Sequence, residues 1–335
     1  MFLYYYILSI PILILSNMLI LFNKSFFYMW MVMEINLISF ISILIMNKFI
    51  YSELILNYFL IQSFNSQMFL MINLLTNLNF MNKFTKIIIF LILMSKMGMP
   101  PFHMWYLKMM KFLNWMIFFI NSSMQKFIPL MILNYYFIYN NMMFYMLTLM
   151  TLIICSIMPL FSMNTSSMKL LMSFSSMIQI SWILILMNSS EIMWILYFNI
   201  YNLINLSLCL MFYYFNINYI FNFNSNKFKK KTNLYFISIQ MFSLAGLPPF
   251  TGFLNKWMFI NNLFNFMSIY FNLMILVFSL MNLFFYSRTI LQIMMFYYNS
   301  FNLNFKFINY KNIKSLKLLF LMIYSMFLLT LYEMI

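Results

Sequence analysis

The chain has 335 residues, of which 65% are apolar and only 7% are charged, and its mean hydropathy is +0.90. Soluble domains carry about 25% charged residues, so these proportions exclude a water-soluble globular protein. The formal net charge of +15 comes from lysines that lie mostly between apolar segments and not on one soluble face, which argues against a nucleic-acid-binding domain.

Uninterrupted apolar stretches of about 20 residues recur along the whole chain, and each can cross roughly 30 Å of hydrocarbon. They do not alternate apolar and polar residues as the strands of a membrane barrel do. We therefore predict an all-α, polytopic transmembrane bundle of about 11 helices that forms a single domain over residues 1–335. In chain order the predicted segments lie near 2–22, 26–46, 53–75, 84–110, 114–137, 142–162, 168–188, 191–215, 233–261, 264–290 and 317–334.

The connections and the composition add two expectations. The clearest loops are 216–232 and 298–316, and no cleavable targeting peptide is expected because the apolar run begins directly at Met1. Forty methionines and 44 phenylalanines stand against three glycines, one alanine and one arginine. Residues with A/T-rich codons are thus enriched, which suggests synthesis from an animal mitochondrial genome.

Two segments share the pattern G-x-P-P-F: "KMGMPPFHMW" (96–105) and "LAGLPPFTGF" (244–253), which hold all three glycines and four of the seven prolines. A proline pair breaks a helix, and a break survives in a membrane only where protein or a wet cavity satisfies the freed backbone groups. About five segments separate the copies, so they should run in opposite directions. This predicts inverted repeats with two discontinuous helices, an arrangement associated with ion pathways. Two ordinary proline kinks are the alternative.

Four charged residues lie inside predicted segments: Glu34, Lys96, Lys126 and Lys256. An ionised side chain at the centre of a bilayer costs about 3 kcal/mol on insertion scales, so such residues usually serve a function. Burial disfavours the charged form of either residue type, and a nearby opposite charge favours it. A Glu–Lys pair that opens and closes therefore changes its proton affinity, which is the minimum needed to move protons.

Plainer explanations exist for most of these charges. Lys126 can reach water if "NSSMQK" ends a helix, and Lys96 and Lys256 can simply cap the carbonyl ends of half-helices. Glu34 has no comparably simple explanation. The remaining acidic residues lie at segment ends, where we expect them to be solvated: Glu53, Glu191 and Glu333.

Several chemistries are excluded. Cys155 and Cys209 are too few and too far apart in the sequence for an iron–sulfur ligand set, and the single histidine, His103, cannot form a metal cluster or a haem pair. No phosphate-binding loop, dinucleotide fingerprint or nucleophile triad is present. We therefore expect that the chain holds no redox cofactor.

At these residues the sequence resembles the NADH dehydrogenase subunit 2 family of mitochondrial respiratory complex I, and its insect-like members in particular. The motifs that carry the resemblance are "KMGMPPFHMW", "MQKFIP", "MKLLMSFSSM" and "LAGLPPFTGFLNKW", and it covers essentially the whole chain. It implies an antiporter-like fold without a cofactor. It also implies that FMN, the Fe–S clusters and ubiquinone belong to other subunits, whose quinone reduction drives proton translocation through a line of buried charges.

The resemblance assigns a role to each buried charge. Glu34 would pair with Lys96 on the first broken helix, Lys126 would be the central lysine, and Lys256 the terminal lysine on the second broken helix. Lys169 matches a family lysine whose role is less certain.

Three departures from the family pattern stand out. Lys108 replaces a usual acid, Gln179 replaces a usual His or Asn near the axis, and Asn255 replaces a usual proline before the second lysine.

We thus predict a non-redox, proton-translocating subunit of complex I in the mitochondrial inner membrane. Its expected partners are other membrane-arm subunits and lipids, and not nucleic acid. One alternative is a freestanding cation/proton secondary transporter of the same fold. The other is a purely structural membrane subunit.

Overall fold

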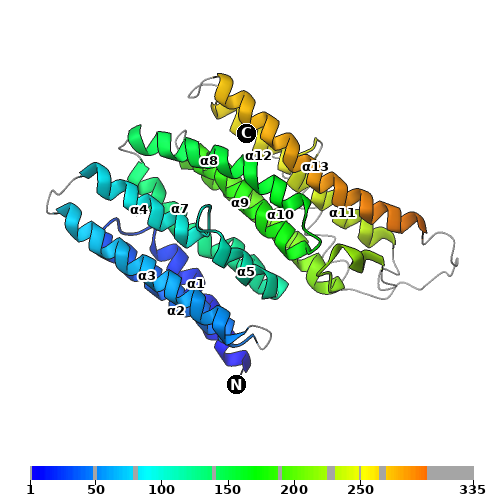
Figure 1. Cartoon of the computed structure of the whole chain (residues 1–335). Helices are drawn as coiled ribbons and strands as arrows, with labels where there is room; N and C mark the ends of the chain where they lie inside the picture. The colour runs from blue at the N-terminus through cyan, green and yellow to red at the C-terminus, as the bar shows by residue number, and fades with distance from the viewer. Residues whose placement is uncertain are drawn as a thin grey trace. The chain divides into compact units, whose positions relative to one another are not determined.

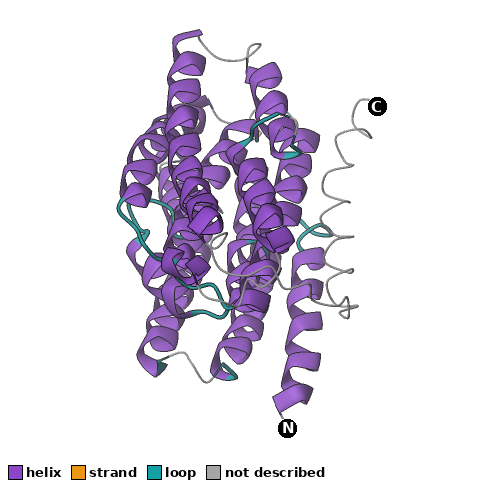
Figure 2. Ribbon diagram, turned by 90° about the vertical axis from the view of Figure 1, so that its right-hand side faces the viewer, coloured by secondary structure: helices purple, strands orange, loops and turns teal. Residues whose placement is uncertain are grey.

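The chain is helical throughout the described regions of a computed structural model, which cover residues 2–47, 51–77, 82–137, 141–187, 191–224, 231–248, 250–263 and 269–299. Loops and turns connect the helices (Figure 2), and within these ranges Ser167 and Tyr219 form an isolated antiparallel bridge. The predicted all-α class is confirmed.

The helices follow the predicted apolar segments closely (Figure 1). They are α1 (Phe2–Leu19), α2 (Phe26–Ile45), α3 (Ser52–Asn77), α4 (Asn82–Met97), α5 (Met104–Phe112), α6 (Trp115–Ser122), α7 (Met124–Phe137), α8 (Asn141–Met163), α9 (Met168–Leu186), α10 (Glu191–Phe215), the 3-10 helix η1 (Ile220–Asn224), α11 (Lys231–Ala245), α12 (Gly252–Leu263) and α13 (Ile269–Asn299). The predicted segment 317–334 and Glu333 lie outside the described residues, as does most of the predicted loop 298–316.

Five stretches of the described residues are long and apolar enough to cross a membrane: Phe26–Ile45, Trp115–Tyr136, Met168–Leu186, Glu191–Phe215 and Tyr270–Gln292. Among the shorter apolar stretches, Tyr235–Ala245 ends directly before the glycine of the second G-x-P-P-F segment. The chain is therefore a multi-pass membrane protein.

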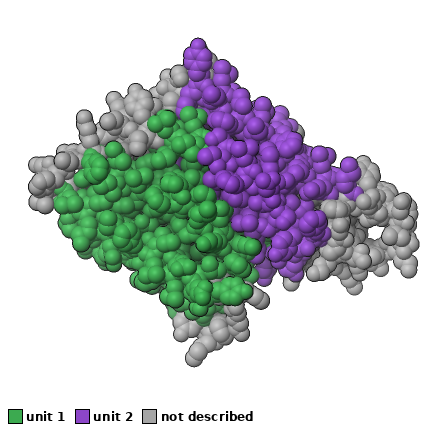
Figure 3. All heavy atoms as spheres, in the orientation of Figure 1, with its two compact units in different colours: residues 1–154 green, residues 155–335 purple. Residues whose placement is uncertain are grey.

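Two compact units divide the chain, residues 1–154 and 155–335, and the boundary falls within α8 (Figure 3). In the first unit α1, α2, α3 and α4 pack in sequence order, and α7 packs on α4 and α1. In the second unit α12 packs on α9, α10 and α11, while α13 packs on α11. The single domain expected over residues 1–335 stays a prediction.

The first G-x-P-P-F segment interrupts a helix between α4 and α5. Gly98 has a φ of 67°, in the left-handed region that glycine adopts readily. Its N–H bonds the Ser95 carbonyl at 3.2 Å, and the Met99 N–H bonds the Met94 carbonyl at 3.0 Å. The Trp105 indole N–H also donates to the Ser95 carbonyl, at 3.2 Å. Protein groups thus satisfy the freed carbonyls, as a membrane requires.

The second G-x-P-P-F segment interrupts a helix between α11 and α12 in the same manner. Gly246 has a φ of 71°. Its N–H bonds the Ser243 carbonyl at 3.0 Å, and the Leu247 N–H bonds the Phe242 carbonyl at 3.4 Å. The two predicted discontinuous helices are confirmed, and they end in matching hydrogen-bond patterns. That the two copies run in opposite directions stays a prediction.

Two features differ from the predicted boundaries. The predicted segment 114–137 is interrupted at Ser123, where the backbone leaves helical geometry (ψ −74°) and the Ser123 hydroxyl bonds the Phe119 carbonyl at 2.6 Å. A serine that bonds back along the helix supports this break without proline or glycine. Within the predicted loop 216–232 the structure has the 3-10 helix η1, and the Met168 N–H bonds the Asn218 carbonyl at 2.9 Å.

Candidate functional site

Glu34 lies half-buried near the middle of α2. The Ser66 hydroxyl of α3 donates a hydrogen bond to its carboxylate Oε1. The Glu34 charge also acts electrostatically on Lys96 of α4. The carboxylate thus lies within electrostatic range of Lys96, while its hydrogen-bond donor is Ser66.

Lys96 occupies the last turn of α4, directly before the first break, and only 8% of it is exposed. It lines two small cavities of the first unit, which share Tyr58, Gln62 and Gln125 as lining residues. The larger has a free volume of about 20 Å³, which is enough for about one water molecule. Lys126 lines the other cavity, so the two lysines face the same polar space.

Amide and hydroxyl side chains join four helices, α2, α3, α4 and α7, around this space. The Tyr58 hydroxyl donates to Gln125 Oε1 at 3.3 Å, and Gln125 Nε2 donates to Asn36 Oδ1 at 2.9 Å. Gln62 Nε2 donates to the Lys96 carbonyl at 3.0 Å, which satisfies another acceptor freed by the break. These residues can hold a water molecule and orient it beside Lys96.

Lys126 lies on the first turn of α7, just after the interruption at Ser123, and is only 2% exposed. Its ammonium group lies over the Tyr106 ring, 4.3 Å from the centroid. This burial argues against the alternative in which Lys126 reaches water from a helix end.

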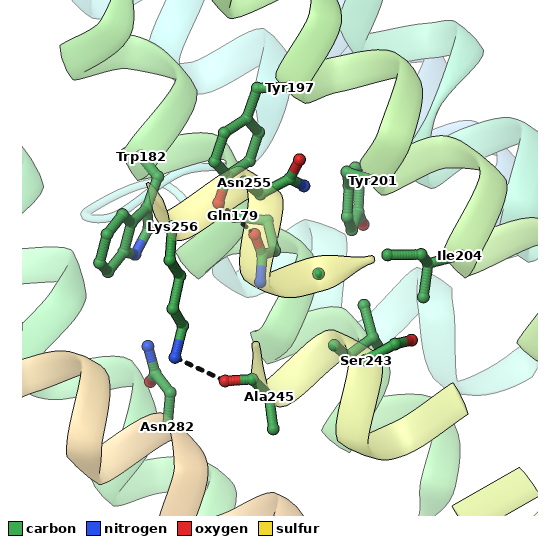
Figure 4. A pocket seen from close by; sticks show the side chains of 12 residues that line it. Gln179, Trp182, Tyr197, Tyr201, Ile204, Ser243, Ala245, Asn255, Lys256 and Asn282 are labelled. Atoms are coloured by element: carbon green, nitrogen blue, oxygen red, sulfur yellow. Dashed lines mark hydrogen bonds between the residues drawn. The ribbon is translucent and has the colours of Figure 1, made fainter. Parts of the chain in front are cut away.

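Lys256 lies on α12, and its ammonium group donates a 2.5 Å hydrogen bond to the Ala245 carbonyl at the end of α11 (Figure 4). The capping role that the sequence left open is thus present for Lys256. The surrounding cavity of the second unit is lined by Gln179, Tyr197 and Asn282, among others. The Tyr197 hydroxyl donates to Gln179 Oε1 at 2.5 Å, so a glutamine here is still part of a polar path beside the lysine.

The other residues singled out in the sequence differ in burial and in their position along the helices. Lys169 is half-buried on the first turn of α9, and Lys108 is exposed on α5. Asn255 is buried beside Lys256, and its presence in place of a proline does not abolish the break. Glu53 and Glu191 are exposed at helix starts, as predicted.

The polar partners of the buried charges were not predicted from the sequence. Tyr58, Gln62 and Ser66 are spaced by four residues, so they share one face of α3. That spacing was the available signal. The contact between Tyr106 and Lys126 had no comparable signal in the sequence, since it depends on how α5 packs after the break.

Within the residues that the structure describes, no group of three or more His, Cys, Asp or Glu side chains is placed to hold a metal ion.

Comparisons with known proteins show the family of the chain. Residues 23–284 match the profile of a family described as NADH:quinone oxidoreductase/Mrp antiporter, TM. The chain belongs to this family. Among its relatives are proteins named NADH-ubiquinone oxidoreductase chain 2. The one from Anopheles gambiae is 36% identical over 92% of this chain and 91% of its own length, and the one from Aedes aegypti is 34% identical over 86% and 85%.

Solved structures share the family fold at low sequence identity. A chain of respiratory complex I from Thermus thermophilus aligns with a TM-score of 0.74 at 15% identity, over 86% of this chain and 70% of that one. A chain of the Mrp complex from Dietzia sp. aligns with a TM-score of 0.73 at 15% identity, over 85% and 59%. These matches establish the antiporter-like architecture of the fold.

Proposed function

We propose that the chain is a core membrane-arm subunit of the proton-pumping NADH:ubiquinone oxidoreductase, complex I, in the mitochondrial inner membrane. Protons pass along Glu34, Lys96, Lys126 and Lys256. The observation that carries this proposal is the placement of three lysines at helix interruptions, each beside a cavity or an aromatic face within a buried polar network. The relatives' name supports the complex to which the chain is assigned.

The side chains suggest how a proton moves in the first unit. The negative charge of Glu34 favours the ammonium form of Lys96. When that interaction weakens, Lys96 releases its proton to water held by Tyr58 and Gln125, and Lys126 faces the same cavity as the acceptor. In the second unit Lys256 exchanges its bond to Ala245 for a bond to water when it takes part in transfer.

No redox cofactor is needed in this chain for such a step, because only protons move. FMN, Fe–S clusters and ubiquinone are assigned to other subunits of the complex. Exposed apolar side chains cover the described helices, for example Leu60, Phe64 and Ile38. They suit contact with lipids and with other membrane-arm subunits, and not with nucleic acid.

A freestanding cation/proton transporter of the same fold is the second candidate, because the family description covers Mrp antiporters as well as oxidoreductase subunits. Gentle detergent extraction followed by affinity purification separates the two. A complex I subunit is recovered with flavin- and Fe–S-containing subunits, whereas a freestanding transporter is recovered alone or as a homo-oligomer.

Glu34→Gln tests the proton role against a purely structural one. The substitution is nearly isosteric and leaves an oxygen that can accept from Ser66, but it removes the charge that acts on Lys96. We expect rotenone-sensitive NADH oxidation and proton uptake to fall by about tenfold, since one lost charge interaction of about 1.4 kcal/mol has that effect. NADH oxidation by an artificial acceptor, which needs only flavin and Fe–S subunits, should persist. Full coupled activity in an assembled Glu34→Gln complex would show that Glu34 has a purely structural role.

A further inference from the structure

The ring of Tyr106 faces the most deeply buried lysine among the described residues. Tyr106 lies on α5 and is 1% exposed, and the Lys126 ammonium lies 4.3 Å from its ring centroid. The face of an aromatic ring attracts a cation, and this attraction is strongest where water is excluded. The face of the Tyr106 ring therefore stabilises the protonated form of Lys126.

The position of this ring is fixed by the first helix break. A Cβ atom placed on Gly98 would lie 2.6 Å from the Tyr106 Cβ, so the Tyr106 side chain packs directly against the glycine backbone. The neighbouring Trp105 indole bonds the Ser95 carbonyl and holds the start of α5 against the end of α4. A change in the geometry of the break must therefore move the ring.

At the second break, the space beside the glycine is filled by a lysine side chain and not by an aromatic ring. A Cβ atom on Gly246 would meet the Cε atom of Lys256 at 2.5 Å. Lys256 follows Gly246 by ten residues, and Lys108 follows Gly98 by ten residues, yet Lys108 is exposed. In the first repeat, the space beside the glycine is filled by a tyrosine ring, and the cation comes from α7 instead.

We propose that Tyr106 is a positioning residue that holds protonated Lys126 through a cation–π contact and ties the charge state of Lys126 to the geometry of the first helix break. This inference rests on the proposed proton-translocating function. It adds a link by which movement at the Gly98 break changes the environment of Lys126, with no hydrogen bond between the two side chains required.

Two substitutions of Tyr106 in the assembled complex separate the ring from the hydroxyl. Tyr106→Phe keeps the aromatic face, and we expect it to retain the kcat of rotenone-sensitive NADH oxidation and the proton uptake per NADH. Tyr106→Leu keeps an apolar side chain but removes the face, and we expect kcat to fall about tenfold or more, as loss of a desolvated cation–π contact implies. The KM for a ubiquinone analogue and NADH oxidation by an artificial acceptor should be unchanged.

Phe118→Leu is the matched control for losing a buried ring. Phe118 is fully buried on α6 and its ring packs on Trp115, and it lines none of the described lysine cavities. The Phe118→Leu substitution should lower the stability of the complex without the tenfold loss of kcat. A similar loss of kcat in Phe118→Leu and Tyr106→Leu would overturn the inference, as would a loss in Tyr106→Phe equal to that in Tyr106→Leu.

Lys126→Met distinguishes failure of the inference from failure of the proposed function. If Lys126→Met abolishes proton uptake while Tyr106→Leu leaves it intact, the proposed role of Tyr106 is wrong and the proposed proton-translocating function is retained. If Lys126→Met itself pumps normally, the proposed function fails.

Discussion

At the residue scale, the two break glycines share a backbone conformation but have different neighbours. Gly98 and Gly246 have φ values of 67° and 71°, where a side chain costs about 1–2 kcal/mol. Beside Gly98 lies the Cβ of Tyr106, which cannot move without its helix. Beside Gly246 lies the Cε of Lys256, near the end of a flexible side chain. The same substitution should thus have different consequences.

We expect Gly98→Ala to reduce the amount of assembled complex severalfold, because both the backbone strain and the clash with Tyr106 displace α5. The Gly246→Ala complex should assemble in larger amounts than the Gly98→Ala complex. Its coupled activity should nevertheless fall, because the added methyl group pushes the Lys256 ammonium away from the Ala245 carbonyl. Native gel electrophoresis and rotenone-sensitive NADH oxidation measure the two effects. Equal assembly of the two variants would contradict this difference.

At the element scale, one side chain of α13 holds the corner between α8 and α9. Arg288 is the single arginine of the chain. Its guanidinium donates to the Met163 carbonyl and, at 3.3 Å, to the Thr165 carbonyl. A cation at a helix C-terminus also interacts favourably with the helix dipole. On the other side of the corner, the Ile220 N–H bonds the Ser166 carbonyl at 3.1 Å.

We predict that Arg288→Met lowers the stability of the protein by about 1–3 kcal/mol, the usual contribution of hydrogen bonds to a charged group. A lower Tm of the purified complex would record it. Arg288→Lys should recover only part of the loss, because an ammonium group lacks the planar fork that reaches two carbonyls at once. A fully stable Lys variant would show that the second carbonyl contact is unimportant.

Sequence reasoning located the helices and the charges but not the contacts around them. Glu34, Lys96 and Lys126 were visible because an ionisable residue within an apolar run is rare. Ser66 was missed although its spacing from Tyr58 and Gln62 places the three on one face of α3. Tyr106 was missed because its role arises only from packing between helices. The interruption at Ser123 was missed for a related reason: neither proline nor glycine accompanies it.

At the scale of the whole molecule, the two broken helices are predicted to run in opposite directions through the membrane. Their far ends should then face opposite sides. Single cysteines at Lys111, near the end of α5, and at Asn261, near the end of α12, test this, since both positions are exposed. The native Cys155 and Cys209 are buried, which keeps background labelling low.

A membrane-impermeant thiol reagent should label Lys111→Cys from one side of the inner membrane and Asn261→Cys from the other. Right-side-out and inside-out vesicles supply the two sides, and permeabilised membranes should label at both positions as a control. Labelling of both cysteines from the same side would rule out the inverted repeat.

The central claim is that protons pass through the buried lysines of this chain, and Lys126→Met tests it most directly. Methionine keeps the length and apolar stem of lysine and removes the ammonium that lies over Tyr106. The matched control is Lys111→Met, which removes an exposed lysine of α5. The measurement is proton uptake per NADH oxidised in sealed inner-membrane vesicles that contain the assembled complex. We predict that Lys126→Met loses most rotenone-sensitive NADH oxidation and the proton uptake coupled to it, while Lys111→Met matches the wild type. An assembled Lys126→Met complex with the wild-type rate and proton uptake would contradict the claim.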